Sequence, residues 1–146
     1  MNLLITGCCG HIGSYLVNNL YKIKKIKKVF IIDNFKSAQI NSLFNSKKIN
    51  NLKFYKLDLS DKNSLNRFGK IDYIIHLASM TNAEDSFNKK NEMYKNNIDC
   101  MKNIIEFSKK RKSKLIHISS TSVYGKQASL VDESCENKYL KPQSPY

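Results

Sequence analysis

Several features are scarce or absent in this sequence, and each absence removes a class of protein. The net charge is +13, yet only Arg67 and Arg111 are arginines. A lysine surplus in a chain also rich in Asn and Ile is typical of an AT-rich genome rather than of nucleic-acid binding. No apolar run approaches the roughly 20 residues of a membrane span, and the opening MNLLITG is too short for a signal peptide. We therefore expect no nucleic-acid partner, no membrane partner and a cytoplasmic location.

The spacing of the cysteines argues against a disulfide framework. The four cysteines contain no CxxC pair, and Cys8 and Cys9 are adjacent, which suits neither an ordinary disulfide nor a zinc site. Cys100 and Cys135 are isolated in the sequence. We expect all four to be structural thiols, and we expect no metal site.

Short β-branched apolar runs alternate with longer helical patterns along the chain. This alternation is typical of βαβ units and a parallel sheet. The predicted strands are residues 3–6, 29–33, 53–57, 73–77 and 115–119, and the predicted helices are 12–24, 38–44, a short one near 62–68, and 90–110. Right-handed crossovers then favour an α/β fold with a doubly wound sheet in the order 3-2-1-4-5. No internal repeat and no Pro- or Gly-rich linker interrupts residues 1–146, so we expect one domain.

Two lysine runs fall where a predicted helix ends and a strand begins. They are KIKKIKK, residues 22–28, and KKRKSK, residues 109–114. Lysines at these places complement the negative end of the helix dipole, whereas ligands of open α/β sheets bind at the opposite edge. We interpret the runs as solvated helix ends, with an accessory polyanion site as the alternative.

The first predicted strand runs directly into TGCCGHIGS, a glycine-rich loop. Gly7, Gly10 and Gly13 form GxxGxxG, so backbone N–H groups and a helix N-terminus can meet a pyrophosphate. We expect Gly10 to require either a positive φ or a side-chain-free approach to phosphate. Asp33 ends the second strand, where a carboxylate accepts hydrogen bonds from an adenosine ribose. This favours NAD, and Lys36 is the one reason to keep NADP open.

The wide glycine spacing and four further stretches resemble the extended short-chain dehydrogenase/reductase superfamily, the NAD-dependent epimerases and dehydratases of nucleotide sugars. The matching stretches are LDLSD (57–61), IDYIIHLAS (71–79), YKNNIDCMKNII (94–105) and ISSTSVYG (118–125). The resemblance implies a Rossmann-type, NAD-binding fold, incomplete at its C-terminal side, and a largely structural role for His76. It implies that the dinucleotide contacts Gly7, Gly10, His11, Ile12, Gly13, Asp33, Asn34, Asp58, Leu59, Leu77, Ala78, Ser79 and Asn97.

The resemblance also implies two catalytic residues. Counting back four residues from Tyr124 in ISSTSVYG places the family's catalytic hydroxyl at Ser120. The final PQSPY resembles the family's Pro-x-Ser-x-Tyr, which makes Tyr146 the expected catalytic base. The lysine that follows this tyrosine by four residues in the family lies beyond the sequence. We therefore expect an N-terminal fragment of an enzyme of roughly twice this length, without its sugar-binding subdomain and inactive alone.

The residues after Ser120 separate the activities found in the family. Sugar 4,6-dehydratases carry Asp-Glu directly after the catalytic hydroxyl, and related decarboxylases keep a Glu at the second of these places. Thr121 and Ser122 stand here, so an acid/base for elimination is missing. This favours a 4-epimerase that acts on a UDP-sugar. The resemblance also implies a homodimer when the protein is full length. The alternatives are a dehydratase or reductase of the same superfamily, or a non-catalytic dinucleotide-binding module.

Overall fold

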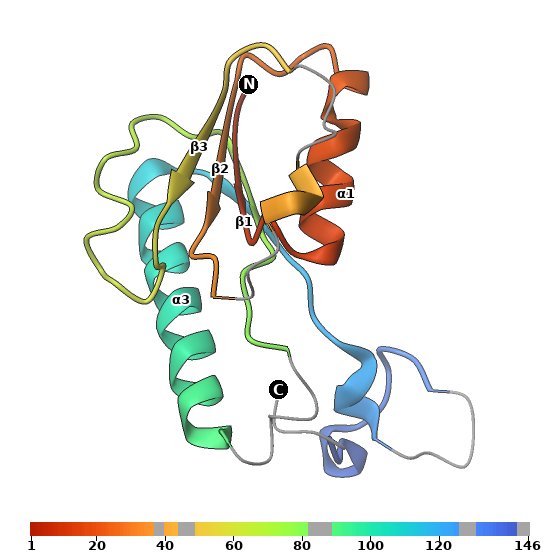
Figure 1. Cartoon of the computed structure of the whole chain (residues 1–146). Helices are drawn as coiled ribbons and strands as arrows, with labels where there is room; N and C mark the ends of the chain where they lie inside the picture. The colour runs from red at the N-terminus through yellow and green to blue at the C-terminus, as the bar shows by residue number, and fades with distance from the viewer. Residues whose placement is uncertain (37–39, 44–48, 82–88, 126–130, 143–146) are drawn as a thin grey trace.

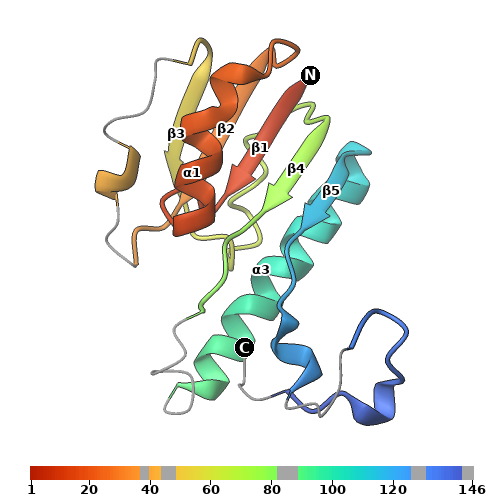
Figure 2. The ribbon, with the colours of Figure 1, turned by 90° about the vertical axis from the view of Figure 1, so that its right-hand side faces the viewer.

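A parallel five-stranded sheet forms the centre of the protein. The computed structural model describes residues 1–36, 40–43, 49–81, 89–125 and 131–142. The strands are β1 (Asn2–Thr6), β2 (Lys28–Asp33), β3 (Leu52–Lys56), β4 (Tyr73–His76) and β5 (Lys114–His117). Their order is β3-β2-β1-β4-β5 with every pairing parallel (Figure 2). The predicted fold class and strand order are confirmed, and each strand begins and ends within two residues of its predicted bounds.

Helices cover both faces of this sheet. The α1 helix (His11–Asn19) lies on one face and α3 (Lys90–Arg111) on the other (Figure 1). Side chains of β1 alternate between the two layers: Leu3 and Ile5 belong to the apolar cluster that contains Val17, whereas Leu4 belongs to the cluster that contains Ile104. A strand that is apolar on both faces is what a doubly wound sheet requires.

The predicted helix 12–24 is shorter than expected. It begins at His11 and ends at Asn19, and a 3₁₀ turn, η1 (Leu20–Lys22), follows. The Asn19 side-chain amide donates to the Tyr15 carbonyl at 2.8 Å. Asparagine has a low helix propensity because its side chain competes for backbone groups, which explains the early end.

The predicted helix near 62–68 is wrong, because the structure has consecutive turns there. Asp61 accepts from the Asn63 N–H through its side chain, and Phe68 donates its N–H to the Leu65 carbonyl. Leu65 and Phe68 are both buried. Turns that place every third residue inward give the same apolar spacing as a helix, so the pattern alone misled the prediction.

Three further 3₁₀ helices complete the described structure. They are η2 (Ile40–Leu43), η3 (Thr121–Tyr124) and η4 (Asn137–Tyr139). Only η2 tests the predicted helix 38–44, and residues 38, 39 and 44 lie outside the described part of the chain. Both η3 and η4 follow β5 and lie beyond the carboxyl ends of the strands (Figures 1 and 2).

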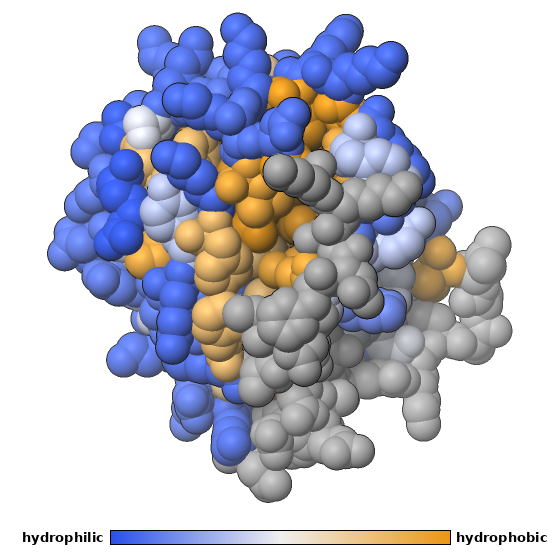
Figure 3. Space-filling view, turned by 45° about the horizontal axis from the view of Figure 1, so that its top comes forward, coloured by the Kyte–Doolittle hydropathy of each residue, from blue (hydrophilic) through white to orange (hydrophobic). Residues whose placement is uncertain are grey.

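The lysine runs lie where the sequence predicted them. Lys109 and Lys110 belong to the last turn of α3, and Lys112, which caps this helix, has a left-handed conformation with φ 55°. Residues 22–28 lead from η1 into β2, and Figure 3 shows hydrophilic residues at this amino-end edge of the sheet, beside an apolar patch. Among the described residues, no helix is long and apolar enough to cross a membrane.

Candidate dinucleotide-binding site

The predicted site residues gather at one edge because parallel strands end on the same side of their sheet. The glycine loop follows β1, Asp33 ends β2, Asp58 follows β3, Leu77 follows β4, and Ser120 follows β5. Tyr146 lies outside the described residues. The structure therefore brings all but one of the predicted site residues to a common edge.

Gly7 and Gly13 are required by close backbone packing. Gly7 has φ +68°, and a Cβ there would lie 2.7 Å from the Ala78 nitrogen. A Cβ on Gly13 would lie 2.1 Å from the Gly7 carbonyl oxygen. The first turn of α1 can therefore lie directly against the end of β1 only because both residues lack a side chain.

Gly10 serves a different purpose from its two neighbours. Its φ of −68° and ψ of 171° are accessible to any residue, so the first alternative, a positive φ, is wrong. A Cβ there would meet only the Gly7 oxygen, at 3.4 Å. The space in front of the loop is open, and the first N–H groups of α1, at exposed His11 and Ile12, have no acceptor within the helix. The loop thus fits an anionic pyrophosphate.

Asp33 is held by the loop that it faces. Its side chain is buried, one carboxylate oxygen accepts from the Cys9 N–H at 2.9 Å, and the other accepts from the Phe35 N–H at 3.0 Å. Each oxygen keeps a second lone pair for a ribose hydroxyl. Asn34 closes a turn by accepting from the Lys36 N–H at 3.0 Å. The carboxylate is therefore pre-oriented at the end of β2.

Asp58 and Lys36 form an ion pair that the sequence did not predict. The Lys36 Nζ lies 3.1 Å from the Asp58 Oδ2, and Ser60 donates both its N–H and its hydroxyl to the Asp58 Oδ1. Burial alone would raise the pKa of Asp58, but the two Ser60 bonds and Lys36 outweigh it and lower that pKa. Leu59 beside it is buried. Lys36 is thus paired to a carboxylate.

His76 is bonded within the sheet. Its Nδ1 lies 2.7 Å from the Thr6 hydroxyl, which also accepts the Leu77 and Ala78 N–H groups at 3.2 Å. Because these two N–H groups occupy both lone pairs of the hydroxyl, its proton is the group left to bond to Nδ1, which assigns the His76 proton to Nε2. Burial, assisted by repulsion from His117, lowers the pKa of His76 to about 4. Sequence reasoning missed Thr6, whose signal is a buried hydroxyl at the end of an otherwise apolar strand.

Asn97 fastens α3 to the chain that follows β4. Its Oδ1 accepts from the Met80 N–H at 2.8 Å, and its Nδ2 donates to the Met80 carbonyl at 3.1 Å. Ser79, directly before Met80, is exposed. Asn97 thereby positions the predicted dinucleotide-contacting stretch that ends at Ser79.

Ser120 lies at the start of η3. Its backbone is extended, its side chain is exposed, and its Oγ accepts from the Ser122 N–H at 3.1 Å. Since that bond uses only a lone pair, the hydroxyl proton is available to a bound molecule. The residue is placed beyond β5, at the same sheet edge as the glycine loop.

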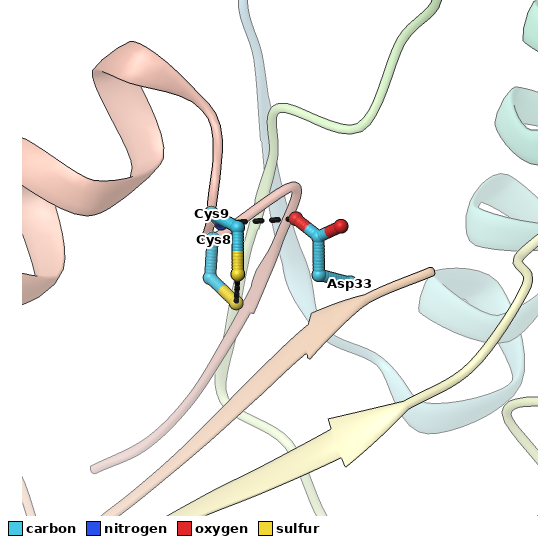
Figure 4. Close-up of side chains that lie close together, drawn as sticks. All are labelled: Cys8, Cys9 and Asp33. Atoms are coloured by element: carbon cyan, nitrogen blue, oxygen red, sulfur yellow. Dashed lines mark hydrogen bonds between the residues drawn. The ribbon is translucent and has the colours of Figure 1, made fainter. Parts of the chain in front are cut away.

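The two adjacent thiols lie close to the side chain of Asp33 (Figure 4). Cys8 and Cys9 have no exposed surface, and their sulfur atoms are 4.0 Å apart. Burial raises the pKa of Cys9 to about 11 and raises the pKa of Cys8 further, and the nearby Asp33 charge acts in the same direction. Both are free thiols, as is buried Cys100.

The strand order and the glycine loop define a dinucleotide-binding domain of the doubly wound class. Residues 3–146 match the NAD dependent epimerase/dehydratase family. The chain belongs to this family, which confirms the resemblance seen in the sequence and NAD as the cofactor of the family.

Relatives of both chemistries are similar to this chain. The dTDP-D-glucose 4,6-dehydratase of Dictyostelium discoideum is 34% identical over 158 residues, covering 99% of this chain and 36% of that protein. The UDP-glucose 4-epimerase of Yersinia enterocolitica is 34% identical over 131 residues, covering 86% of this chain and 38% of that protein. The structure of DesIV, a dTDP-glucose 4,6-dehydratase from Streptomyces venezuelae with NAD and TYD bound, matches with a TM-score of 0.88 and 27% identity, covering 100% of this chain and 47% of that one. The chain therefore spans less than half the length of each.

Proposed function

We propose that the whole protein is an NAD-dependent nucleotide-sugar epimerase that inverts C4 of a UDP-sugar through a 4-keto intermediate. The relatives do not choose between epimerase and dehydratase, since both kinds are equally identical to this chain. The observation that carries the proposal is the composition of η3, where Thr121 and Ser122 follow Ser120. Neither side chain can act as the acid/base that elimination of water requires at neutral pH.

The carboxyl edge of the sheet supplies the residues that would hold the cofactor. The open Gly10 position and the first N–H groups of α1 suit the pyrophosphate, and the oriented Asp33 carboxylate suits an unphosphorylated ribose. NAD, when bound, accepts and returns the hydride of the sugar. A 2′-phosphate would place negative charge against Asp33, which favours NAD over NADP.

Two residues of this chain are assigned to the sugar hydroxyl. Tyr146 would take the proton of the 4-hydroxyl as hydride leaves C4, and the free Ser120 proton would orient the same oxygen. The keto sugar then turns over and receives hydride on its other face, so net redox is zero. The homodimer implied by the resemblance remains a prediction, which light scattering tests.

The test is an activity assay of the whole protein with two substrates. We expect interconversion of UDP-glucose and UDP-galactose, and we expect no release of a 4-keto-6-deoxy sugar from dTDP-glucose. Ser120→Ala and Tyr146→Phe should each lower kcat by at least about 100-fold, while Ser119→Ala, a neighbouring exposed serine, should not. Production of the 4-keto-6-deoxy sugar would favour the dehydratase alternative. NAD binding without either activity would favour the non-catalytic module.

A further inference from the structure

The two thiols and Asp33 form a cluster that the proposed reaction does not use. The sulfur atoms of Cys8 and Cys9 and a carboxylate oxygen of Asp33 all lie within 4.8 Å of one another, and all three residues are buried (Figure 4). Zinc binds sulfur at about 2.3 Å, so two sulfur ligands at the tetrahedral angle lie ~3.8 Å apart. The observed separation is 4.0 Å. A disulfide requires about 2.05 Å, so the two sulfurs are not bonded to each other, and their spacing is close to that of two sulfur ligands of one zinc ion.

We propose that Cys8, Cys9 and Asp33 form a binding site for a thiophilic divalent cation such as Zn²⁺ or Cd²⁺. Adjacency in the sequence argued against such a site, but here the third ligand comes from another strand. The ligands meet because Gly7 turns the chain with a positive φ directly after β1, which places the thiols against the end of β2.

The surroundings of the cluster hold its ligands in place. The Asp33 carboxylate accepts the Cys9 and Phe35 N–H groups, the Cys8 N–H donates to the Ile32 carbonyl at 3.3 Å, and the Ser42 hydroxyl donates to the Cys9 carbonyl at 3.0 Å. Hydrogen bonds of this kind orient metal ligands and raise affinity. Binding releases one proton from each thiol to solvent, and two thiolates and one carboxylate then face the two positive charges of the cation.

Cation and dinucleotide would compete for this site. The inference on competition rests on the proposed function, in which Asp33 accepts hydrogen bonds from the ribose. A carboxylate that binds the cation through one oxygen has only its other oxygen left to accept a ribose hydroxyl, and the cation neutralises its negative charge. Because both thiols are fully covered, the cation must enter through local opening of the loop, which a dinucleotide lying across the loop prevents. The cation therefore binds only to protein molecules that have no dinucleotide bound.

Cadmium titration of the purified chain tests the site directly. We expect one equivalent to bind with a thiolate-to-cadmium charge-transfer band in the ultraviolet. Cys8→Ser and Cys9→Ser should each weaken binding at least tenfold, whereas Cys100→Ser, a buried thiol elsewhere, should not change it. Circular dichroism checks that the variants fold. In the unsubstituted chain, bound cadmium should protect Cys8 and Cys9, but not half-exposed Cys135, from slow alkylation. An unchanged titration in the double Cys8→Ser/Cys9→Ser variant, or no protection of the pair, overturns the proposal.

A second titration separates this proposal from the proposed function. NAD at ten times its dissociation constant should weaken cadmium binding about tenfold, and cadmium should weaken NAD binding by the same linkage. Cadmium bound at the pair with no effect of NAD contradicts the competition and leaves the epimerase assay unaffected. Conversely, an absence of epimerase activity leaves the cadmium titration unaffected, because that titration needs neither sugar nor turnover.

Discussion

The buried His76 should make the stability of the fold depend on pH in a defined window. Burial and the nearby His117 lower its pKa from 6.5 to about 4, and its side chain is only 2% exposed. The unfolded chain therefore binds a proton at a pH where the native protein does not. The stabilisation is fully present above pH 6.5 and is lost as the pH falls from 6.5 toward 4.

The size of this effect follows from the difference between the two pKa values. Each pKa unit corresponds to about 1.4 kcal/mol, so His76 should contribute roughly 2 kcal/mol less at pH 5 than at pH 7, and roughly 3 kcal/mol less at pH 4. Substitution to Asn removes the titration while keeping a carbonyl oxygen that can accept the Thr6 proton.

Urea unfolding of the unsubstituted chain and His76→Asn between pH 7.5 and 4 measures the effect. The difference between their free energies of unfolding should shrink with falling pH by the amounts above, and His11→Gln, at an exposed histidine, should follow the unsubstituted chain. In NMR, the ring protons of His76 should not titrate above about pH 5. Parallel curves for the unsubstituted chain and His76→Asn, or a His76 titration near pH 6.5, would refute the buried neutral histidine.

Further predictions concern the loop and the cofactor. Gly10→Val should abolish NAD binding and leave the far-UV circular dichroism spectrum nearly unchanged. Gly13→Val should lower the free energy of unfolding in urea by at least about 1–3 kcal/mol, because its side chain would meet backbone atoms. The reverse pattern would contradict the roles assigned to the two glycines. Asp33→Ala should weaken NAD binding by roughly 1–3 kcal/mol in calorimetry, and an unchanged affinity would remove Asp33 from the site. Asp58→Asn should break the ion pair with Lys36 and reduce the ratio of the affinity for NAD to the affinity for NADP, and Asp58→Asn with Lys36→Met should restore this ratio. An affinity ratio that neither change affects would show that the ion pair does not contribute to it.

Much of the fold could be predicted because its signals are local. The β-branched runs, the spacing of their crossovers and the glycine loop fix the sheet order, and the carboxyl ends of parallel strands then converge by geometry. The turns at 62–68 were mispredicted as a helix. Asp61 forms a turn through its side chain, but the buried Leu65 also has the apolar spacing that a helix would give. The early end of α1 at Asn19 was not predicted either, because the end of a helix depends on single side chains.

The site was predicted as a set of positions but not as a network. The Lys36–Asp58 pair joins two loops, so it depends on loop conformation that no periodicity encodes. The Thr6–His76 bond joins the ends of β1 and β4, so it depends on the register of these two strands. The cysteine cluster was not predicted, because its third residue, Asp33, lies on the neighbouring strand and far from the two cysteines in the sequence. The role of Gly10 could be narrowed only when its backbone angles and the space around it were known.

The lysine-rich edge and the cofactor edge are separated by the full length of the strands. Five residues of β1 span roughly 17 Å, about two Debye lengths at physiological ionic strength. A charge added at the amino ends of the strands therefore has almost no electrostatic effect at Asp33 and the glycine loop. Replacement of the lysines of residues 22–28 by Asn, Gln or Glu should then be nearly neutral for cofactor affinity. A lineage with a biased genome can raise the isoelectric point of this protein by drift along that edge, without selection acting on its chemistry.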